Sequence, residues 1–204
     1  MNLILDYIFY FFFYSICGWI LETVCCSIYY KKPINRGFMS GPFVPIYGAG
    51  ALVLCGSLMP LYNKFGYTWY MIPVVILLGV ILANVLEYMT SLVMEKLFHA
   101  RWWDYSSEKF NLHGRICLKH SIYWALATGA IIYVVHPFIV KHTERLISDE
   151  LRNIMIIFIG IIFGIDYVIT WINAKNKKMR NIVSSDNRII EDAETPEKEN
   201  EHKK

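Results

Sequence analysis

Long apolar runs separated by shorter polar segments dominate the chain. Apolar runs of about 18 residues or more are typical of transmembrane helices, because about 20 helical residues cross the hydrocarbon core of a bilayer. Five such runs are present. Their approximate bounds are residues 4–30, 41–62, 69–98, 118–140 and 153–173. The pattern therefore predicts an all-α, polytopic membrane helix bundle.

The chain changes character after Ala174. From there it is polar and charged, and it ends in DAETPEKENEHKK. A segment of this composition cannot bury enough apolar surface to fold. We therefore expect two parts: a transmembrane bundle over residues 1–174 and a disordered, charged cytoplasmic tail over residues 175–204.

Composition agrees with a membrane protein and argues against several kinds of site. The chain of 204 residues is 55% hydrophobic and carries a formal net charge of +3. It has no basic-aromatic nucleic-acid motif, so we expect no nucleic-acid partner. The five cysteines form no CxxC pair and have no histidine at metal-ligand spacing. These spacings argue against a zinc site and a disulfide framework, and we expect neither a metal nor a cofactor.

Positive residues are distributed unevenly among the predicted loops. If the C-terminus is cytoplasmic, the loops at 31–36 and 96–119 are cytoplasmic too, and they hold most of the loop Lys and Arg residues. Four basic residues remain on the other side: Lys64, Lys141, Arg145 and Arg152. Because short cytoplasmic loops are enriched in Lys and Arg, we expect a multi-pass plasma-membrane protein with its N-terminus outside.

The segment between the third and fourth apolar runs is unusual for a loop. It reads EKLFHARWWDYSSEKFNLHGRICLKH over residues 95–120. This composition is too aromatic for a solvated linker and too polar for a membrane span. We expect residues 99–117 to fold as a polar, aromatic cap at the cytoplasmic surface. Its candidate binding residues are Trp103, Asp104, Asn111 and Arg115.

Glycine and proline interrupt the stretch NRGFMSGPFVPIYG, residues 35–48, too often for regular helix. Non-helical backbone at membrane depth is tolerated only where protein or a water-filled cavity covers it. We therefore expect an irregular, re-entrant loop that lines a cavity, with Asn35, Arg36 and Tyr47 as candidate binding residues. Arg36 could bind a carboxylate or phosphate. The alternative is an ordinary basic loop beside anionic lipid headgroups.

A polar stripe runs along the third apolar run. Asn84, Glu87, Ser91 and Glu95 are spaced by three, four and four residues, which places them on one helical face. A stripe with two carboxylates should face the bundle interior, because ionisable groups in lipid are costly and mark functional sites. The alternative is a hydrogen-bonded seam between helices.

Two further acids lie inside apolar runs. Glu22 and Asp166 are each about eight residues from the cytoplasmic end of their run, which is roughly 12 Å deep. Together with Glu87 they predict one polar cavity open to the cytoplasmic leaflet, beneath the arginines of the loops. A structural, paired Glu22 is the alternative. His136, near the outer end of the fourth run, is expected to pack or cap and is left outside the site.

Four stretches of the chain resemble a known family. They are YSICGWILE, NRGFMSGPFVPIYG, EYMTSLVMEKLFHARWWDYS and FNLHGRICLKHSIYW. They are similar to type IV ABC-transporter permeases, CmpB-like small bacterial membrane proteins with distant animal relatives. The resemblance covers roughly residues 8–170 and implies a transport component. The chain has no P-loop GxxxxGK[ST], so an ATPase would be a separate subunit.

Three functions remain open at this point. In a transport component, the buried acids would bind a cation, a cationic solute or a proton. In a membrane-embedded enzyme, a buried carboxylate would act as a base on a lipid or phosphorylated substrate held by arginines. The enzyme is favoured by polar residues that concentrate at one interface and by the lack of an internal repeat. The third function is a structural or regulatory subunit. No catalytic residue can be assigned.

Overall fold

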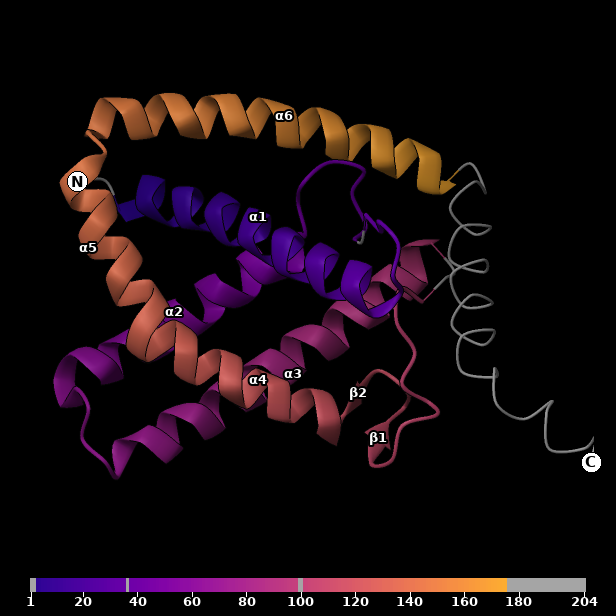
Figure 1. Cartoon of the computed structure of the whole chain (residues 1–204), viewed down its shortest axis with the longest axis horizontal. Helices are drawn as coiled ribbons and strands as arrows, with labels where there is room; N and C mark the ends of the chain where they lie inside the picture. Colours follow the sequence, from indigo (N-terminus) through magenta and orange to yellow (C-terminus); the bar gives the residue numbers. More distant parts are fainter. Residues whose placement is uncertain (1–2, 36, 99–100, 176–204) are drawn as a thin grey trace, which may run out of the picture.

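Five long helices and one short hairpin make up the structure, a computed structural model that describes residues 3–35, 37–98 and 101–175 (Figure 1). All five helices are long and apolar enough to cross a membrane, which confirms the predicted all-α membrane bundle. Arg36 and the predicted tail from residue 176 onward lie outside the described residues. In chain order the elements are α1 (Leu3–Tyr29), α2 (Pro45–Phe65), α3 (Met71–Phe98), β1 (Asn111–Leu112), β2 (Ile116–Cys117), α4 (Leu118–Ala130), the π-helical turn η1 (Ile131–Val135), α5 (His136–Leu146) and α6 (Asp149–Lys175).

Two helices begin four residues away from the predicted position. α2 begins at Pro45 rather than at residue 41, so residues 45–48 belong to its first turn and not to the irregular loop. Proline fits there because the first helical N–H has no partner within the helix. α6 begins at Asp149 rather than at residue 153. Ser148 caps it, since its Oγ accepts a hydrogen bond from Leu151 N at 3.2 Å.

The fourth span is longer than predicted and carries one irregular turn. It runs through α4, η1 and α5 to Leu146. Pro137 lacks the N–H that would bond to the carbonyl of Tyr133 four residues earlier. That carbonyl instead accepts a hydrogen bond from the Tyr67 hydroxyl at 2.5 Å. The proline therefore explains both the irregular turn and the use of a side-chain donor from another segment.

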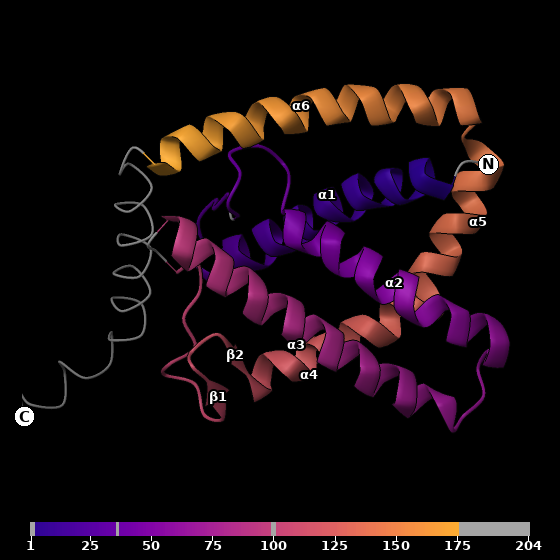
Figure 2. The ribbon, with the colours of Figure 1, turned by 180° about the vertical axis from the view of Figure 1, so that it is seen from behind.

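The helices form two layers that meet at α1. α6 packs along α1 at one side of the molecule, and α2, α3 and α4 pack against one another on the other side (Figures 1 and 2). The N-terminus, α5 and the start of α6 lie at one end of the bundle, and the hairpin lies at the other end. The fully buried apolar core lies between α2, α3 and η1 and consists of Leu54, Cys55, Leu58, Val75, Ile132 and Tyr133.

Glycines allow two helix pairs to approach closely. A Cβ at Gly48 of α2 would lie 2.2 Å from Ser15 Oγ of α1, and a Cβ at Gly79 of α3 would lie 2.2 Å from Thr128 Cγ2 of α4. Small residues at such contacts are typical of helix packing in membranes, where close approach supplies the attraction between helices. The backbones of α1 and α2, and of α3 and α4, are thereby brought together around the polar residues of the bundle.

The segment between α1 and α2 folds back onto the bundle, as expected for the irregular loop. Gly41 N donates to Asp166 Oδ2 of α6 at 2.9 Å, and Val44 N donates to the Ser15 carbonyl of α1 at 3.1 Å. Met39 and Phe43 are each 3% exposed. Protein thus covers part of the non-helical backbone and satisfies the N–H groups of Gly41 and Val44, as is required of such backbone at membrane depth.

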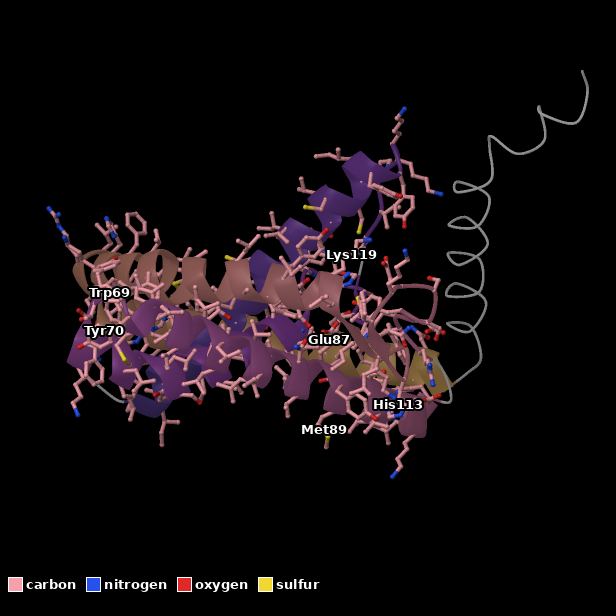
Figure 3. The ribbon with its side chains drawn as sticks, turned by 90° about the horizontal axis from the view of Figure 1, so that it is seen from below. Trp69, Tyr70, Glu87, Met89, His113 and Lys119 are labelled. Carbon is pink, nitrogen blue, oxygen red and sulfur yellow. The ribbon has the colours of Figure 1, made fainter. Side chains whose placement is uncertain are left out.

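α3 separates polar from apolar residues on opposite faces. Its buried residues recur every four positions at Val75, Gly79, Ala83, Glu87 and Ser91. The exposed face is apolar as far as Val93 and includes Leu77, Ile81, Val85, Met89 and Val93; the exposed Lys96 follows in the last turn. Figure 3 shows Glu87 inside the bundle and Met89 on its outer side. An apolar outer face with carboxylates turned inward is the arrangement expected of a membrane helix.

Candidate functional site

The side chain of Glu87, a residue of α3, points toward α4 and the cap, and Glu87 is 5% exposed. Its Oε1 accepts a hydrogen bond from the Tyr105 hydroxyl at 3.0 Å, and its Oε2 accepts one from Trp124 Nε1 at 2.9 Å. Both donors are neutral. Within the described ranges no ion pair involves Glu87. The carboxylate is therefore buried against neutral donors alone in that part of the chain.

Glu95, two turns further along α3, binds two arginines of the cap. Its Oε2 accepts from Arg115 Nη2, and its Oε1 accepts from Arg101 Nε at 3.1 Å. Arg115 also donates from Nη1 to Ser91 Oγ at 2.8 Å. Arg115 is 7% exposed, so its guanidinium is buried, whereas the Glu95 side chain that balances its charge is 36% exposed. The two arginines are thus already occupied by Glu95.

Two more contacts complete this polar group. Asn84, one turn before Glu87, is hydrogen-bonded through Nδ2 to Ser121 Oγ of α4 at 2.9 Å. Trp103 donates from Nε1 to the Arg115 carbonyl at 3.0 Å and so fixes the backbone that carries the guanidinium. We refer to the following residues as the Glu87 cluster: Asn84, Glu87, Ser91, Glu95, Trp103, Tyr105, Arg115, Ser121 and Trp124.

The Tyr105 phenol is held in its protonated form. Burial raises its pKa far above the usual value, and the Glu87 carboxylate raises it further. A protonated phenol can donate to Glu87 at any physiological pH. Tyr105 N also donates to the Gly114 carbonyl at 2.7 Å. The backbone of the hairpin therefore positions the hydroxyl against the carboxylate.

A tight turn brings Arg115 over α3. Arg115 N donates to the Leu112 carbonyl at 3.0 Å, and both central residues have positive φ, 56° at His113 and 67° at Gly114. Positive φ at both positions is the requirement of a type I′ hairpin turn. Glycine supplies one of these conformations without steric cost. The antiparallel pair β1 and β2 then leads directly into α4.

Two of the predicted binding residues make hydrogen bonds that shape the cap. Asn111 Oδ1 accepts from Gly114 N at 2.9 Å, and its Nδ2 donates to the Glu108 carbonyl at 2.8 Å. Asp104 Oδ1 accepts from Ser106 N and Oγ, and these hydrogen bonds lower the pKa of the Asp104 carboxyl. Both side chains thus stabilise turns of the cap. These turns hold the cap together although its strands are only two residues long.

The other predicted residues lie on α1, α2 and α6. Tyr47 of α2 packs against Gly18 of α1, where an added Cβ would meet the Tyr47 ring at 2.3 Å. Its ring centroid is 6.3 Å from that of Trp124, so Tyr47 borders the Glu87 cluster. Glu22 follows Gly18 by one turn on the same face of α1 and is half-buried. Whether Glu22 shares a site with Glu87 stays a prediction.

Asp166 and Asn35 hold the irregular loop. Asp166 accepts from Gly41 N, which fixes the loop to α6. Asn35 accepts from Trp19 Nε1 at 2.6 Å through Oδ1 and donates to the Ser40 carbonyl at 2.8 Å through Nδ2. These contacts give both residues a role in the path of the loop. Across residues 3–35, 37–98 and 101–175, no group of three or more His, Cys, Asp and Glu residues could hold a metal ion.

Comparison with known proteins gives one match that covers most of the chain. Residues 9–171 match the model of a family described as "Putative ABC-transporter type IV" (ABC_trans_CmpB). The chain belongs to this family. The resemblance inferred from the sequence is thereby confirmed. The comparisons with curated proteins and with solved structures each gave no match.

The family match spans every element of the Glu87 cluster. It begins within α1 and ends within α6, so the cap and the stripe of α3 both lie inside it. The sequence patterns of this family member did not reveal the two donors to Glu87. Trp124 and Tyr105 stand in the printed sequence as ordinary interfacial aromatics, and only the fold brings them to a carboxylate. The sequence did contain one signal for these donors: a tryptophan and a tyrosine near the ends of spans, close to a span that contains a glutamate.

A second polar group, also missed, lies at the opposite end of the bundle in this family member. Arg152 of α6 binds Asp6 of α1, with Nη1 2.9 Å from Oδ1, and binds Asp149, with Nη2 2.8 Å from Oδ1. Nearby, the Tyr14 hydroxyl is hydrogen-bonded to His136 Nδ1 at 3.0 Å. Asp6, Arg152 and His136 are each less than a tenth exposed. The expectation that polar residues concentrate at one interface is therefore wrong.

Proposed function

We propose that this protein is the membrane-spanning component of a transport system, and that Glu87 binds a proton or the cationic part of the transported solute. The observation that carries the proposal is the environment of Glu87: a buried carboxylate with two neutral donors and no ion pair to any described residue. A buried carboxylate without a counter-charge is costly in the ionised state. It gains most from binding a proton or a cation.

The family description supports the same class of function. A component of an ABC transporter needs an ATPase, and the chain has no P-loop. We therefore infer a separate ATPase subunit as partner. The polar groups at both ends of the bundle also agree better with passage across the membrane than with chemistry confined to one interface.

A membrane-embedded enzyme acting on a phosphorylated substrate is less well supported. That mechanism needs arginines able to hold phosphate beside Glu87. Arg101 and Arg115 are both bonded to Glu95, so a phosphate would have to displace a carboxylate from each. Charge-assisted hydrogen bonds of this kind are stronger than neutral ones. The arginines of the cap are better explained as the counter-charge of Glu95.

Purification from native membranes tests the proposal. We expect an ATPase subunit and a solute to co-purify with the wild-type protein and to be identified by mass spectrometry. Glu87→Gln should keep the fold and the ATPase subunit, because glutamine preserves the shape of the side chain, but it should lose the solute. Glu150→Gln, an exposed carboxylate of α6, is the matched control and should keep both.

Either part of this proposal can fail separately. A wild-type preparation without an ATPase subunit would contradict the transport system. Solute retained by Glu87→Gln at the wild-type level would contradict the role of Glu87. Thermal unfolding of each variant would show whether a loss reflects binding or folding.

The proposed orientation places the Glu87 cluster on the cytoplasmic side, with the N-terminus outside and the C-terminus inside. It rests on the Lys and Arg residues of the loops at that end. A phosphatase that is active only outside the cytoplasm should be inactive when fused after Lys175. The same enzyme inserted after Gly66, between α2 and α3, should be active. The reverse pattern would rule out this orientation.

A further inference from the structure

The hairpin of the cap presents an apolar surface away from the bundle. Phe110 is 81% exposed, and its neighbours Leu112 and Leu118 are 51% and 52% exposed. The opposite side of the same segment is polar and buried, because Tyr105 and Arg115 lie in the Glu87 cluster. The hairpin therefore turns Arg115 inward and carries Phe110 and Leu112 on its outer side, where Asn111 and His113 are exposed as well.

This apolar surface continues the outer face of the fourth span. Leu118, the first residue of α4, donates its N–H to the Phe110 carbonyl at 3.2 Å, so the two residues are direct neighbours. From Leu118 onward, exposed apolar side chains recur through α4, η1 and α5. They include Leu118, Ile122, Leu126, Val134 and Phe138. In a membrane-spanning helix this face contacts lipid, and Phe110 extends it beyond the start of the helix.

Charge at the hairpin suits the surface of a membrane. Lys109, beside Phe110, is exposed and makes no ion pair within the described part of the chain. Lys119 is held by Glu108, with Nζ 2.7 Å from Oε1. Exposed apolar side chains beside a basic residue are typical of segments that lie at the boundary of headgroups and acyl chains.

The hairpin holds Phe110 in a fixed place. Phe110 has φ 54°, a conformation that a bulky residue adopts only where its surroundings determine it. The neighbouring hydrogen bonds of Asn111 to Gly114 and Glu108 supply that constraint. Figure 3 places His113 and Lys119 of this region at the end of the bundle opposite Trp69 and Tyr70. Those two aromatics are 80% and 51% exposed, as expected of the other membrane interface.

We propose that residues 108–118 form an interfacial anchor that binds anionic phospholipid. Phe110 and Leu112 insert at the boundary between headgroups and acyl chains, and Lys109 lies at a lipid phosphate. Continuity with the lipid-facing side of α4 favours lipid over a protein partner as the occupant. The proposal does not depend on transport. It does imply that an ATPase subunit binds elsewhere at this end of the molecule.

Photochemical crosslinking tests this proposal on the full chain. The Phe110→p-benzoylphenylalanine variant would be placed in nanodiscs of equal parts phosphatidylglycerol and phosphatidylethanolamine and irradiated. Mass spectrometry of the intact protein would then detect the crosslinked lipids. We expect lipid adducts in a yield comparable to that of the same substitution at Leu126, which faces lipid within the span. The same substitution at Ser107, an exposed polar position of the cap, should give several-fold less.

Adding Lys109→Ala to the crosslinking variants tests whether the charge of Lys109 selects anionic lipid. It should lower the share of phosphatidylglycerol among the adducts at position 110, while adducts at position 126 keep their composition. A yield at position 110 no higher than at Ser107 would overturn the anchor. An unchanged lipid composition would overturn the role of Lys109. Crosslinking in native membranes that gives a polypeptide in place of lipid would identify this surface as a protein docking site and contradict the proposal.

Discussion

Replacing Arg152 with alanine is expected to destabilise the protein far more than the loss of an exposed arginine. Arg152 is 4% exposed and Asp6 is 9% exposed, so the ion pair between α6 and α1 is enclosed. Removing one partner of a buried pair leaves the other charge without compensation, which costs about 3–5 kcal/mol. We therefore expect a large drop in the unfolding temperature of Arg152→Ala in nanodiscs.

Arg145→Ala is the matched control for this prediction. Arg145 lies nearby at the end of α5 and is exposed, so its removal should leave the unfolding temperature almost unchanged. A double variant, Asp6→Asn with Arg152→Ala, should regain part of the loss because the unpaired carboxylate is gone. Equal unfolding temperatures for the two alanine variants would show that the pair contributes nothing to stability.

The second large effect is expected at Arg115. Arg115→Ala removes the ion pair to Glu95 and the buried hydrogen bond to Ser91; a buried hydrogen bond made by a charged group, such as the one to Ser91, contributes about 1.5–3 kcal/mol. It also leaves empty space where α3 meets the cap. We expect a lower unfolding temperature and faster proteolysis of the cap. Mass spectrometry of the proteolytic fragments would show where the chain is cut.

Arg101→Ala should have a smaller effect on both measurements. Arg101 binds the same Glu95, but its side chain is 32% exposed against 9% for that of Arg115. Exposed ion pairs contribute little because solvent screens them. If the two alanine variants are equally unstable, burial of Arg115 is not what holds the cap on α3.

The membrane spans could be predicted because they depend on a local property, the length of an apolar run. The stripe on α3 could be predicted for a similar reason, since helical spacing alone places Asn84, Glu87 and Ser91 on one face. Its burial also follows, because the cost of an ionisable group in lipid directs the carboxylate inward. Nothing beyond the sequence of α3 itself is needed for these inferences.

The partners of that stripe could not be predicted because they depend on how distant segments meet. Tyr105 reaches Glu87 only through the hairpin, whose two-residue strands are too short to leave an alternating pattern. Asn111 and Asp104 have the side chains of ligands, but also those of turn residues, and the structure uses them in turns. α2 begins at Pro45 because proline is favoured in the first turn of a helix. In the sequence alone, the glycines and prolines around Pro45 suggest an irregular loop there.

The ion pair between Asp6 and Arg152 also bears on the order in which the protein can be assembled. Asp6 is in α1 and Arg152 is in α6, so the carboxylate is synthesised well before its partner. At about 5–20 residues per second, synthesis of the chain between them takes roughly 7 to 30 s. During that interval α1 carries a carboxylate whose partner does not yet exist. The ion pair that joins α1 to α6 can therefore form only after α6 has been synthesised, so the packing of these two helices is a late step of assembly.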